Sequence, residues 1–231
     1  TMPDLWCVVT NDADRVNPPW PHLRDIVDPR LVKVDRTTNR GRYHQDASVL
    51  AATDTPWWTV HDADDAAHPD WLENMLRVAP GRDVVFTSQT VIGLRGRREL
   101  EPPKPAAHDG QLHHYAHMAG LWRTDWLKRI GGPHPGYRVG YDTLLSSVAH
   151  MFGAVALIGT PQYTRYRRFG SLTTSKATGI RSKYRAGQRA RLAALWRQIA
   201  DTCSTPDQIG ALVRSQDRPA WSEVYRDGQS L

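Results

Sequence analysis

The sequence lacks the features of a membrane-spanning or disulfide-stapled protein. No apolar run among its 231 residues approaches the roughly 18 residues needed to cross a bilayer. The N-terminus lacks the basic start and long apolar core of a signal peptide. The two cysteines, Cys7 and Cys203, lie far apart in the chain, which is typical of free thiols in a reducing cytosol. We therefore expect a cytoplasmic protein built from one large domain, or from one domain with an appendage.

Glycine is also missing where a phosphate-binding loop would need it. The segment that follows the first apolar run, VVTNDADR, holds no glycine, which argues against a nucleotidyltransferase with a glycine-rich phosphate loop. Nor does the chain contain an internal repeat or a low-complexity tract. These absences leave a globular enzyme or binding domain of ordinary composition, with 40% hydrophobic and 23% charged residues.

The charge is positive overall and unevenly distributed. The net charge is +6, with lysine and arginine gathered in GLRGRREL, RYRRFG and IRSKYRAGQRARLAALWRQ, and aspartate gathered near residues 62–70. A basic surface beside an acidic cluster suits a metal-bound phosphate ester at least as well as a nucleic acid backbone. The alternative is that these clusters are solvated faces. A nucleic acid partner is not expected, because the acidic cluster would repel its phosphates.

Alternating apolar runs and helical patterns predict the elements of an α/β fold. Short apolar runs predict strands at 4–10, 30–35, 56–61, 83–89, 90–96, 154–159 and 162–168. Helical patterns are found at 43–52, from Pro69 to residue 79, after Thr124, from about Asp142, at 181–200 and after Thr205. Strands that alternate with helices favour a mainly parallel sheet flanked by helices.

The composition changes near residue 180. Leu192, Leu195, Trp196 and Ile199 recur at helical spacing in the basic segment 181–200. We therefore divide the chain into a catalytic domain and a helical C-terminal extension that packs on it, at residues 1–179 and 180–231.

Three carboxylates follow the strand predicted at 56–61. Asp62 and Asp64 fall on the same side of an extended chain because side chains alternate. Hard oxygen ligands of this kind suit Mg²⁺ or Mn²⁺, which usually also take substrate phosphates. Ligand sites in α/β sheets collect at the carboxyl ends of strands. Spacing alone leaves a metal–phosphate site and a plain acidic loop both open, and Asp65 is compatible with the start of the next helix.

An ordered set of motifs resembles the glycosyltransferases of the GT-A (Rossmann-like) fold, in particular the large family 2 group. NRGRYHQDASVLAATDTPWWTVHDADDAAHPDWLENM resembles that family's Asn-x-Gly, helix, strand and Asp-x-Asp-Asp features. AGLWRTDWLKRIGG, GYDTLLSSVAHMFG and YRRFGSLTTS resemble its downstream half in the same order. The resemblance covers roughly residues 4–175.

The resemblance implies roles for the acidic residues. Asp62 would hold the donor ribose or join the metal shell, and Asp64 would coordinate Mn²⁺ or Mg²⁺ against the donor diphosphate. Asp142 falls where the family's catalytic base lies, in a motif usually written Glu-Asp, although Tyr141 stands in the first position here. The implied reaction is an inverting transfer, in which Asp142 takes the proton of an acceptor hydroxyl. Without the family, Asp142 would be interpreted as a residue at a helix N-terminus.

Arginines and hydroxyls lie where related enzymes bind the diphosphate. These are Arg165, Arg167 and Arg168, with Ser171 and Thr173. Alternate residues of one strand share a face, so Arg165 and Arg167 are expected to act together, and the guanidinium fork suits phosphate oxygens.

Histidines occur nearby, although the expected one is absent. Many family members carry a histidine close to the position of Phe169. His113, His114 and His117 lie upstream and leave a histidine metal ligand open, beside the alternative of surface or packed histidines.

The N-terminal nucleotide-binding region is shorter than the family pattern. Asp12, Asp14 and Asp35 are candidate uridine or ribose contacts, or simply polar residues at strand ends. Trp122, beside Gly120, is the aromatic residue expected to border the acceptor pocket.

Three functions remain in view. The leading one is a metal-dependent glycosyltransferase that uses a nucleotide-diphospho-sugar, with a UDP-sugar favoured, in polysaccharide, glycolipid or natural-product biosynthesis. Its acceptor would be a sugar, a lipid-linked molecule or a small molecule. The alternatives are a sugar nucleotidyltransferase and a degenerate nucleotide- or glycan-binding module. The basic helix at 181–200 would pack on the catalytic domain or sit against the inner membrane face.

Overall fold

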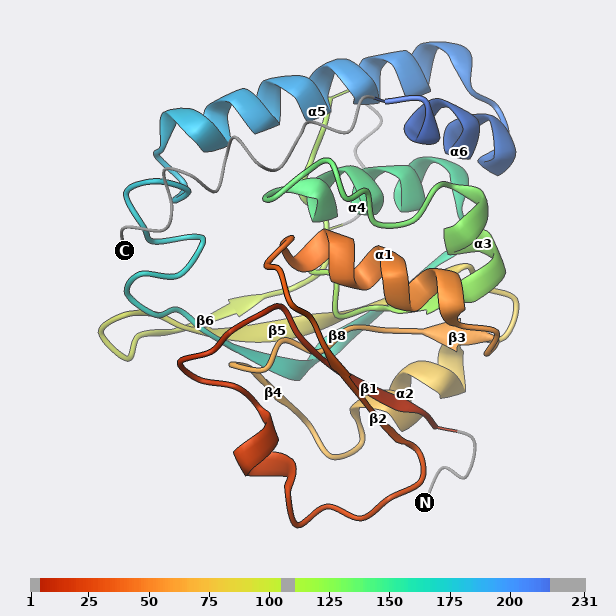
Figure 1. Ribbon diagram of the computed structural model, residues 1–231. Helices are drawn as coiled ribbons and strands as arrows, with labels where there is room; N and C mark the ends of the chain where they lie inside the picture. The colour runs from red at the N-terminus through yellow and green to blue at the C-terminus, as the bar shows by residue number, and fades with distance from the viewer. Residues whose placement is uncertain (1–4, 105–110, 217–231) are drawn as a thin grey trace.

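The computed structural model describes residues 5–104 and 111–216 of the chain (Figure 1). The helices are η1 (Trp20–Leu23), α1 (Arg42–Ala52), α2 (Trp71–Val78), α3 (Thr124–Arg129), α4 (Tyr141–Phe152), α5 (Lys183–Thr202) and α6 (Pro206–Arg214). The strands are β1 (Cys7–Asn11), β2 (Leu31–Asp35), β3 (Trp57–Trp58), β4 (Ala66–Ala67), β5 (Val84–Ile92), β6 (Arg98–Glu101), β7 (Leu121–Arg123) and β8 (Val155–Tyr166).

Two sheets make up the β structure. β1 and β2 form a parallel two-stranded sheet. The other strands form a six-stranded sheet in the order β3-β7-β5-β8-β4, with β6 also paired to β5. β5 and β8 are parallel, whereas β3, β4, β6 and β7 pair antiparallel to their neighbours. The α/β fold flanked by helices is thus confirmed, with one correction, because the larger sheet is mixed and not mainly parallel.

The six-stranded sheet has a buried cluster on each face. Successive residues of β5 point to opposite faces, as the period of a strand requires, so Val84 and Phe86 join one cluster and Val85 joins the other. Helices α1, α3 and α4 cover the first face, and α2 covers the second (Figure 1). On α2, Trp71 and Met75 are buried, one helical turn apart. Both layers therefore follow from the apolar periodicity of the sequence.

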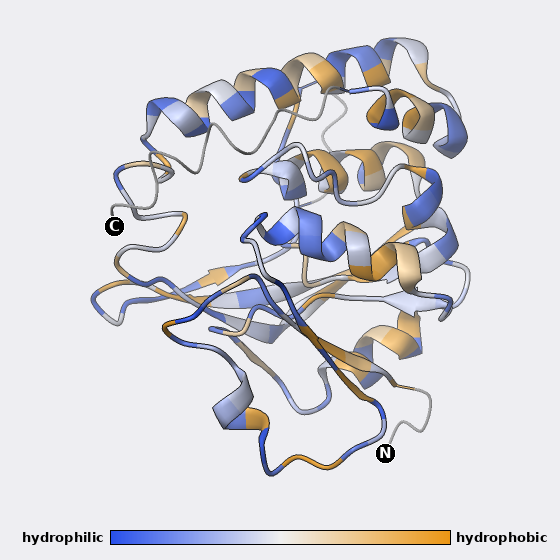
Figure 2. Ribbon diagram, in the orientation of Figure 1, coloured by the Kyte–Doolittle hydropathy of each residue, from blue (hydrophilic) through white to orange (hydrophobic). Residues whose placement is uncertain are grey.

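The two C-terminal helices form an outer layer over α3 and α4 (Figure 1). The stripe of Leu192, Leu195, Trp196 and Ile199 on α5 is buried in the same cluster as α4. In Figure 2, α5 alternates between blue and orange, as expected for a helix with one buried and one solvated face. Thr205 and Gln208 form the capping box of α6 that the sequence predicts. In the described part of the chain, no helix is long and apolar enough to cross a membrane.

Two pairs of predicted strands are single strands. The runs at 83–89 and 90–96 merge into β5, because no turn residue separates them. The runs at 154–159 and 162–168 merge into β8, which continues past Gly159 and Pro161. The β5–β8 register shifts opposite these two residues. A bulge absorbs the glycine and the proline without ending the strand.

Smaller differences concern the ends of elements. The predicted strand at 56–61 is reduced to β3. Helix α2 begins at Trp71 after Asp70, so Pro69 lies before the helix and not in its first turn. Asp65 does not begin this helix either, because it lies directly before β4.

Candidate active site

The ends of β1 and β2 meet the start of α1. Asp12 Oδ1 accepts hydrogen bonds from the backbone N–H of Arg40 (2.8 Å) and from Gln45 Nε2 (2.6 Å), and Asp12 Oδ2 accepts from the N–H of Gly41 (2.6 Å). Gly41 has φ +84°, a conformation that favours glycine. Asp12, expected to contact the donor, therefore anchors the Asn-Arg-Gly turn from which α1 begins.

Asp35 is also engaged within the protein. Its Oδ1 accepts from Asn11 Nδ2 at 2.8 Å, and its Oδ2 lies 3.4 Å from Arg15 Nη1. The Asp35 side chain stays 45% exposed, so it remains accessible to a polar ligand. Asp14 likewise accepts from backbone N–H groups, those of Val16 and Asn17.

The first residue of α1 carries the charge that balances the acidic cluster. Arg42 Nη1 donates to Asp62 Oδ2 (2.9 Å), and Arg42 Nε donates to Asp46 Oδ2 (3.3 Å). Burial opposes the charge of Arg42, but Asp62 and Asp46 outweigh it and raise the pKa of the guanidinium. Its Nη2 is buried and has no hydrogen-bond partner within residues 5–104 and 111–216. Arg42 is thus a buried cation that pairs with both Asp62 and Asp46.

The buried carboxyl of Asp46 makes stability depend on pH. Burial raises its pKa to about 6, with Arg42 opposing the shift. Because the pKa is higher in the folded chain, the stabilisation from protonated Asp46 is lost as the pH rises through about 6. We expect Asp46→Asn to increase the free energy of unfolding at pH 8 by on the order of 1–2 kcal/mol and to change it little at pH 4. Urea unfolding at both pH values measures this difference.

Asp25→Asn is the control for that experiment, since the Asp25 side chain is 87% exposed. An equal effect of Asp46→Asn at pH 4 and pH 8 would show that Asp46 does not titrate in this range.

Asp62 has further neighbours on the sheet side. Its backbone N–H donates to Tyr163 Oη at 3.0 Å, and its Oδ2 lies 3.7 Å from His117 Nε2. Burial, with Arg165 and Arg42, lowers the pKa of His117 well below its ordinary value, so the imidazole is neutral. His117 Nδ1 accepts from the N–H of Ala119 (3.3 Å), which places the ring proton on Nε2. His117 therefore turns the Nε2 side of its neutral ring toward the Asp62 carboxylate.

Asp64 and Asp65 are bound by residues at and just beyond the end of β8. Arg168 Nη2 donates to Asp64 Oδ2 at 2.5 Å, and the N–H of Tyr166 donates to Asp65 Oδ1 at 3.0 Å. Burial raises the pKa of Asp65, although the Tyr166 hydrogen bond opposes the shift. The Asp64 side chain is 32% exposed, so its carboxylate remains accessible to a ligand.

These contacts test whether a divalent cation fits. Within residues 5–104 and 111–216, no three histidine, cysteine, aspartate or glutamate side chains converge to hold a metal ion. Asp62 and Asp64 supply the oxygen ligands that Mg²⁺ and Mn²⁺ prefer, but each accepts from an arginine. The donor set therefore fits a site completed by substrate phosphates and water, and not a site made by the protein alone.

Two of the predicted arginines, one in β8 and one directly after it, share one carboxylate. Arg165 Nη1 lies 3.7 Å from Glu101 Oε2, and Arg167 Nη2 lies 3.4 Å from Glu101 Oε1. Both therefore act on the same partner, as the strand alternation predicts, although that partner is a glutamate that the sequence analysis missed. Ser171 Oγ lies within hydrogen-bond distance of Thr173 and Thr174 in the loop that follows.

Asp142 lies at the start of α4, next to α1. Tyr43 Oη donates to Asp142 Oδ1 (3.1 Å), and His114 Nδ1 lies 3.9 Å from Asp142 Oδ2. Burial opposes ionisation, but His114, Arg42 and the Tyr43 hydrogen bond together lower the pKa of Asp142. An ionised carboxylate of this kind can accept a proton at neutral pH. Because Arg42 and Tyr43 are consecutive, α1 holds Asp62 and Asp142 through neighbouring residues.

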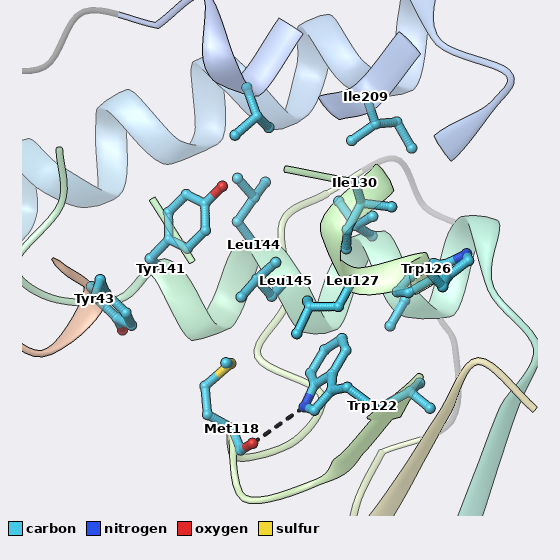
Figure 3. Close-up of a cluster of buried hydrophobic side chains, with 14 of the residues drawn as sticks. Tyr43, Met118, Trp122, Trp126, Leu127, Ile130, Tyr141, Leu144, Leu145 and Ile209 are labelled. Atoms are coloured by element: carbon cyan, nitrogen blue, oxygen red, sulfur yellow. Dashed lines mark hydrogen bonds between the residues drawn. The ribbon is translucent and has the colours of Figure 1, made fainter. Parts of the chain in front are cut away.

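Two aromatic residues lie in the core and not in the site (Figure 3). Trp122, expected to border the acceptor pocket, is completely buried and donates from Nε1 to the Met118 carbonyl at 3.3 Å. That prediction is wrong, because β7 turns the indole toward the helices. Tyr141 is also fully buried, with its ring 5.1 Å from that of Tyr137. A glutamate at this position would bury a carboxylate among aromatic rings, which accounts for the tyrosine.

The sequence analysis missed Arg42, Tyr43, Asp46 and Glu101. One signal was available for the first two. They directly follow the Asn-Arg-Gly turn, and a helix that starts at a ligand-binding edge points its first residues there. Arg42 and Asp46 stand four residues apart on α1, a spacing at which opposite charges pair on a helix, so a local pattern marked Asp46 as well. The partners of Glu101 are set by folding, and no local pattern marks them.

Comparison with solved structures shows which proteins share this fold. The structure of S. aureus TarS in complex with UDP-GlcNAc is similar with a TM-score of 0.56 and 17% identity, over 72% of this chain and 50% of that chain. The complex of TarS with UDP is similar with a TM-score of 0.60 and 15% identity, over 90% of this chain and 60% of that chain. The structure of TarS 1-349 whose description names no ligand has a TM-score of 0.59 and 18% identity, over 98% of this chain and 65% of that chain. Identities this low show the fold alone, and this chain spans between half and two thirds of those TarS chains.

Sequence comparison gives the family. No curated protein matches the chain. The sequence model of the family described as Glycosyl transferase family 2 matches residues 1–140, which include the Asn-Arg-Gly turn and the acidic cluster. Since this match covers more than half of the chain, the protein belongs to glycosyl transferase family 2.

Proposed function

We propose that this protein transfers a sugar from a nucleotide-diphospho-sugar, with a UDP-sugar favoured, to an acceptor hydroxyl with inversion at the anomeric carbon. One observation carries the proposal, namely that Arg42 and Tyr43 hold Asp62 and Asp142 from neighbouring positions of α1. A carboxylate suited to the donor thereby lies near a carboxylate suited to proton abstraction. The printed titles of the TarS structures, with UDP and UDP-GlcNAc, support the choice of donor.

In this mechanism Asp142 is the general base. Its lowered pKa keeps it ionised, so it accepts the proton as the acceptor oxygen attacks the sugar. Arg165 and Arg168 stabilise the negative charge that develops on the departing diphosphate. Their present partners, Glu101 and Asp64, are partly exposed, so each arginine can exchange its carboxylate for a phosphate oxygen. Arg42 stays in place, since its charge is needed by Asp46 and Asp62.

Asp64, with Asp62, would hold the Mn²⁺ or Mg²⁺ ion. Such a cation would supply charge neutralisation for the leaving diphosphate when bound. Arg168 then has to leave Asp64, and its guanidinium becomes available to a phosphate oxygen.

Thermal unfolding with nucleoside diphosphates tests the donor assignment. UDP with Mn²⁺ should raise the Tm by roughly 5 °C at a concentration of about 100 times its Kd. The shift should disappear with EDTA and in Asp64→Asn, whereas Asp25→Asn, on the exposed surface, should keep it. Equal shifts in Asp64→Asn and the unaltered chain would contradict the role of Asp64 in binding the metal.

Turnover separates the enzyme from a binding module. Release of UDP from a panel of UDP-sugars, measured with and without candidate acceptors, should depend on both substrates. Binding of UDP without any release from any sugar donor would favour the degenerate module.

A further inference from the structure

The hydroxyl of Tyr43 makes two hydrogen bonds to one residue. It donates to Asp142 Oδ1 (3.1 Å), and it accepts from the backbone N–H of Asp142 (3.2 Å). Asp142 is the second residue of α4, whose N-cap is Gly140 and has no side chain to satisfy the free N–H groups. The Tyr43 hydroxyl thus takes over part of the cap while it fixes the carboxylate of the same residue.

Tyr43 can keep both bonds because its proton does not leave. Burial and the neighbouring charge of Asp142 raise the pKa of the phenol well above its ordinary value. The hydroxyl therefore remains a donor to the ionised Asp142 carboxylate at neutral pH. With its backbone N–H and its carboxylate bound to one atom, the Asp142 side chain has little freedom to rotate away.

The tyrosine itself is firmly placed. Its side chain is buried, and its ring meets that of Tyr141 edge to face, with centroids 5.7 Å apart. The turn before it is anchored by Asp12, which accepts from Arg40, Gly41 and Gln45. β1 therefore fixes α1, and α1 fixes the start of α4.

We propose that Tyr43 is a positioning residue for glycosyl transfer, which holds the Asp142 carboxylate in its ionised form and in one orientation toward the acceptor hydroxyl. The proposal rests on the proposed function for Asp142 as the base. Tyr43 does not touch substrate in this role and acts only through Asp142.

Other charged groups also face Asp142. His114 Nδ1 lies 3.9 Å from its Oδ2, and Arg42 and Arg165 favour its ionised form from α1 and β8. Removing the Tyr43 hydroxyl leaves these cations in place but removes a donor to the charged carboxylate. The pKa of Asp142 should then rise, without reaching that of an isolated buried carboxyl.

Tyr43→Phe tests the proposal because it keeps the ring and its packing. We expect kcat to fall about 10- to 100-fold, as when a hydrogen bond to a charged group is lost, with the donor KM nearly unchanged. A base must be deprotonated, so activity is lost as the pH falls through its pKa. The acidic limb of the kcat–pH profile should therefore move up by roughly one pH unit.

Tyr141→Phe is a closely matched control. It removes a buried hydroxyl that has no hydrogen-bond partner among the residues that the structure describes. The ring that carries it contacts Tyr43, and Tyr141 directly precedes Asp142 in the chain. This substitution should leave kcat and its pH profile unchanged. A wild-type kcat and pH profile in Tyr43→Phe, or equal losses in both variants, would overturn the proposal.

A titration without turnover distinguishes this proposal from the proposed function. The ¹³C carboxyl signal of Asp142, assigned by its absence in Asp142→Asn, should titrate at a higher pH in Tyr43→Phe than in the unaltered chain. If no sugar is transferred but this shift is observed, the contact holds and the proposed function fails. If sugar is transferred and the signal does not shift, the positioning role fails alone.

Discussion

Asp142→Asn should lower kcat about 1,000-fold, within the range that general base catalysis contributes, and leave the Kd of the donor within about twofold. Asparagine matches the aspartate in size and can still accept the Tyr43 hydrogen bond, but it cannot take the proton of the acceptor. In the proposed mechanism, Asp62, Asp64 and the arginines bind the donor, and the substitution leaves these residues in place. Initial rates of UDP release and calorimetric titration with UDP measure the two quantities.

Asp125→Asn is the matched control, since Asp125 is the second residue of α3 as Asp142 is of α4. Both side chains lie in the first turn of a helix, where a negative charge is favourable. The control should lose a few tenths of a kcal/mol of stability at most, as is usual for such surface charges, and keep its kcat. Turnover by Asp142→Asn at the wild-type rate would remove Asp142 from the mechanism.

Gly210→Ala should lower the free energy of unfolding by about 2–3 kcal/mol, as overpacking does. Gly210 lies inside α6, where alanine would otherwise be the better helix former. A Cβ at this position would overlap the carbonyl oxygen of Arg129 at the end of α3. α6 would have to move away and would withdraw Ile209 and Val213 from the buried cluster.

The same substitution on α5, Gly187→Ala, should raise the free energy of unfolding and not lower it. Apart from its chain neighbours and the backbone of α5 itself, no atom of the described residues lies within 4 Å of a Cβ added there. Only helix propensity then acts, and the free energy of unfolding should rise by about 0.5–1 kcal/mol. Urea unfolding compares the two variants directly. A Gly210→Ala protein as stable as Gly187→Ala would mean that α6 does not need its close approach to α3.

The sequence predicted what depends on local periodicity. The stripe of α5 and the inward face of α4 follow from residue spacing. The strand-end position predicted for Asp62 and Asp64 is wrong, because the strand ends at Trp58 and both aspartates lie in the segment between β3 and β4. Period and composition reveal which face of an element is buried, and in a helical or extended segment that is enough to place the side chain.

Partners distant in the sequence could not be predicted in the same way. Arg168 reaches Asp64 across 104 positions, and Tyr43 reaches Asp142 across 99. Such pairs depend on how β8 and α1 are placed in three dimensions, which spacing does not encode. The prediction for Trp122 was wrong for a related reason. A three-residue strand can turn the indole to either face of the sheet, and packing against α3 and α4 decides which face it takes.

The separation of the two sheets has a consequence for motion. In the described residues, β1 and β2 bond to each other in a ladder that does not continue into the six-stranded sheet. A short ladder of this kind opens at a lower free energy than the global unfolding of the domain, so its amides should exchange with solvent deuterium ahead of those in β5 and β8. Asp12, just past the end of β1, would lose its hydrogen bonds to the start of α1 during such an opening. The orientation of Arg42 and Tyr43 at the start of α1 would therefore depend on a ladder that opens before the main sheet unfolds.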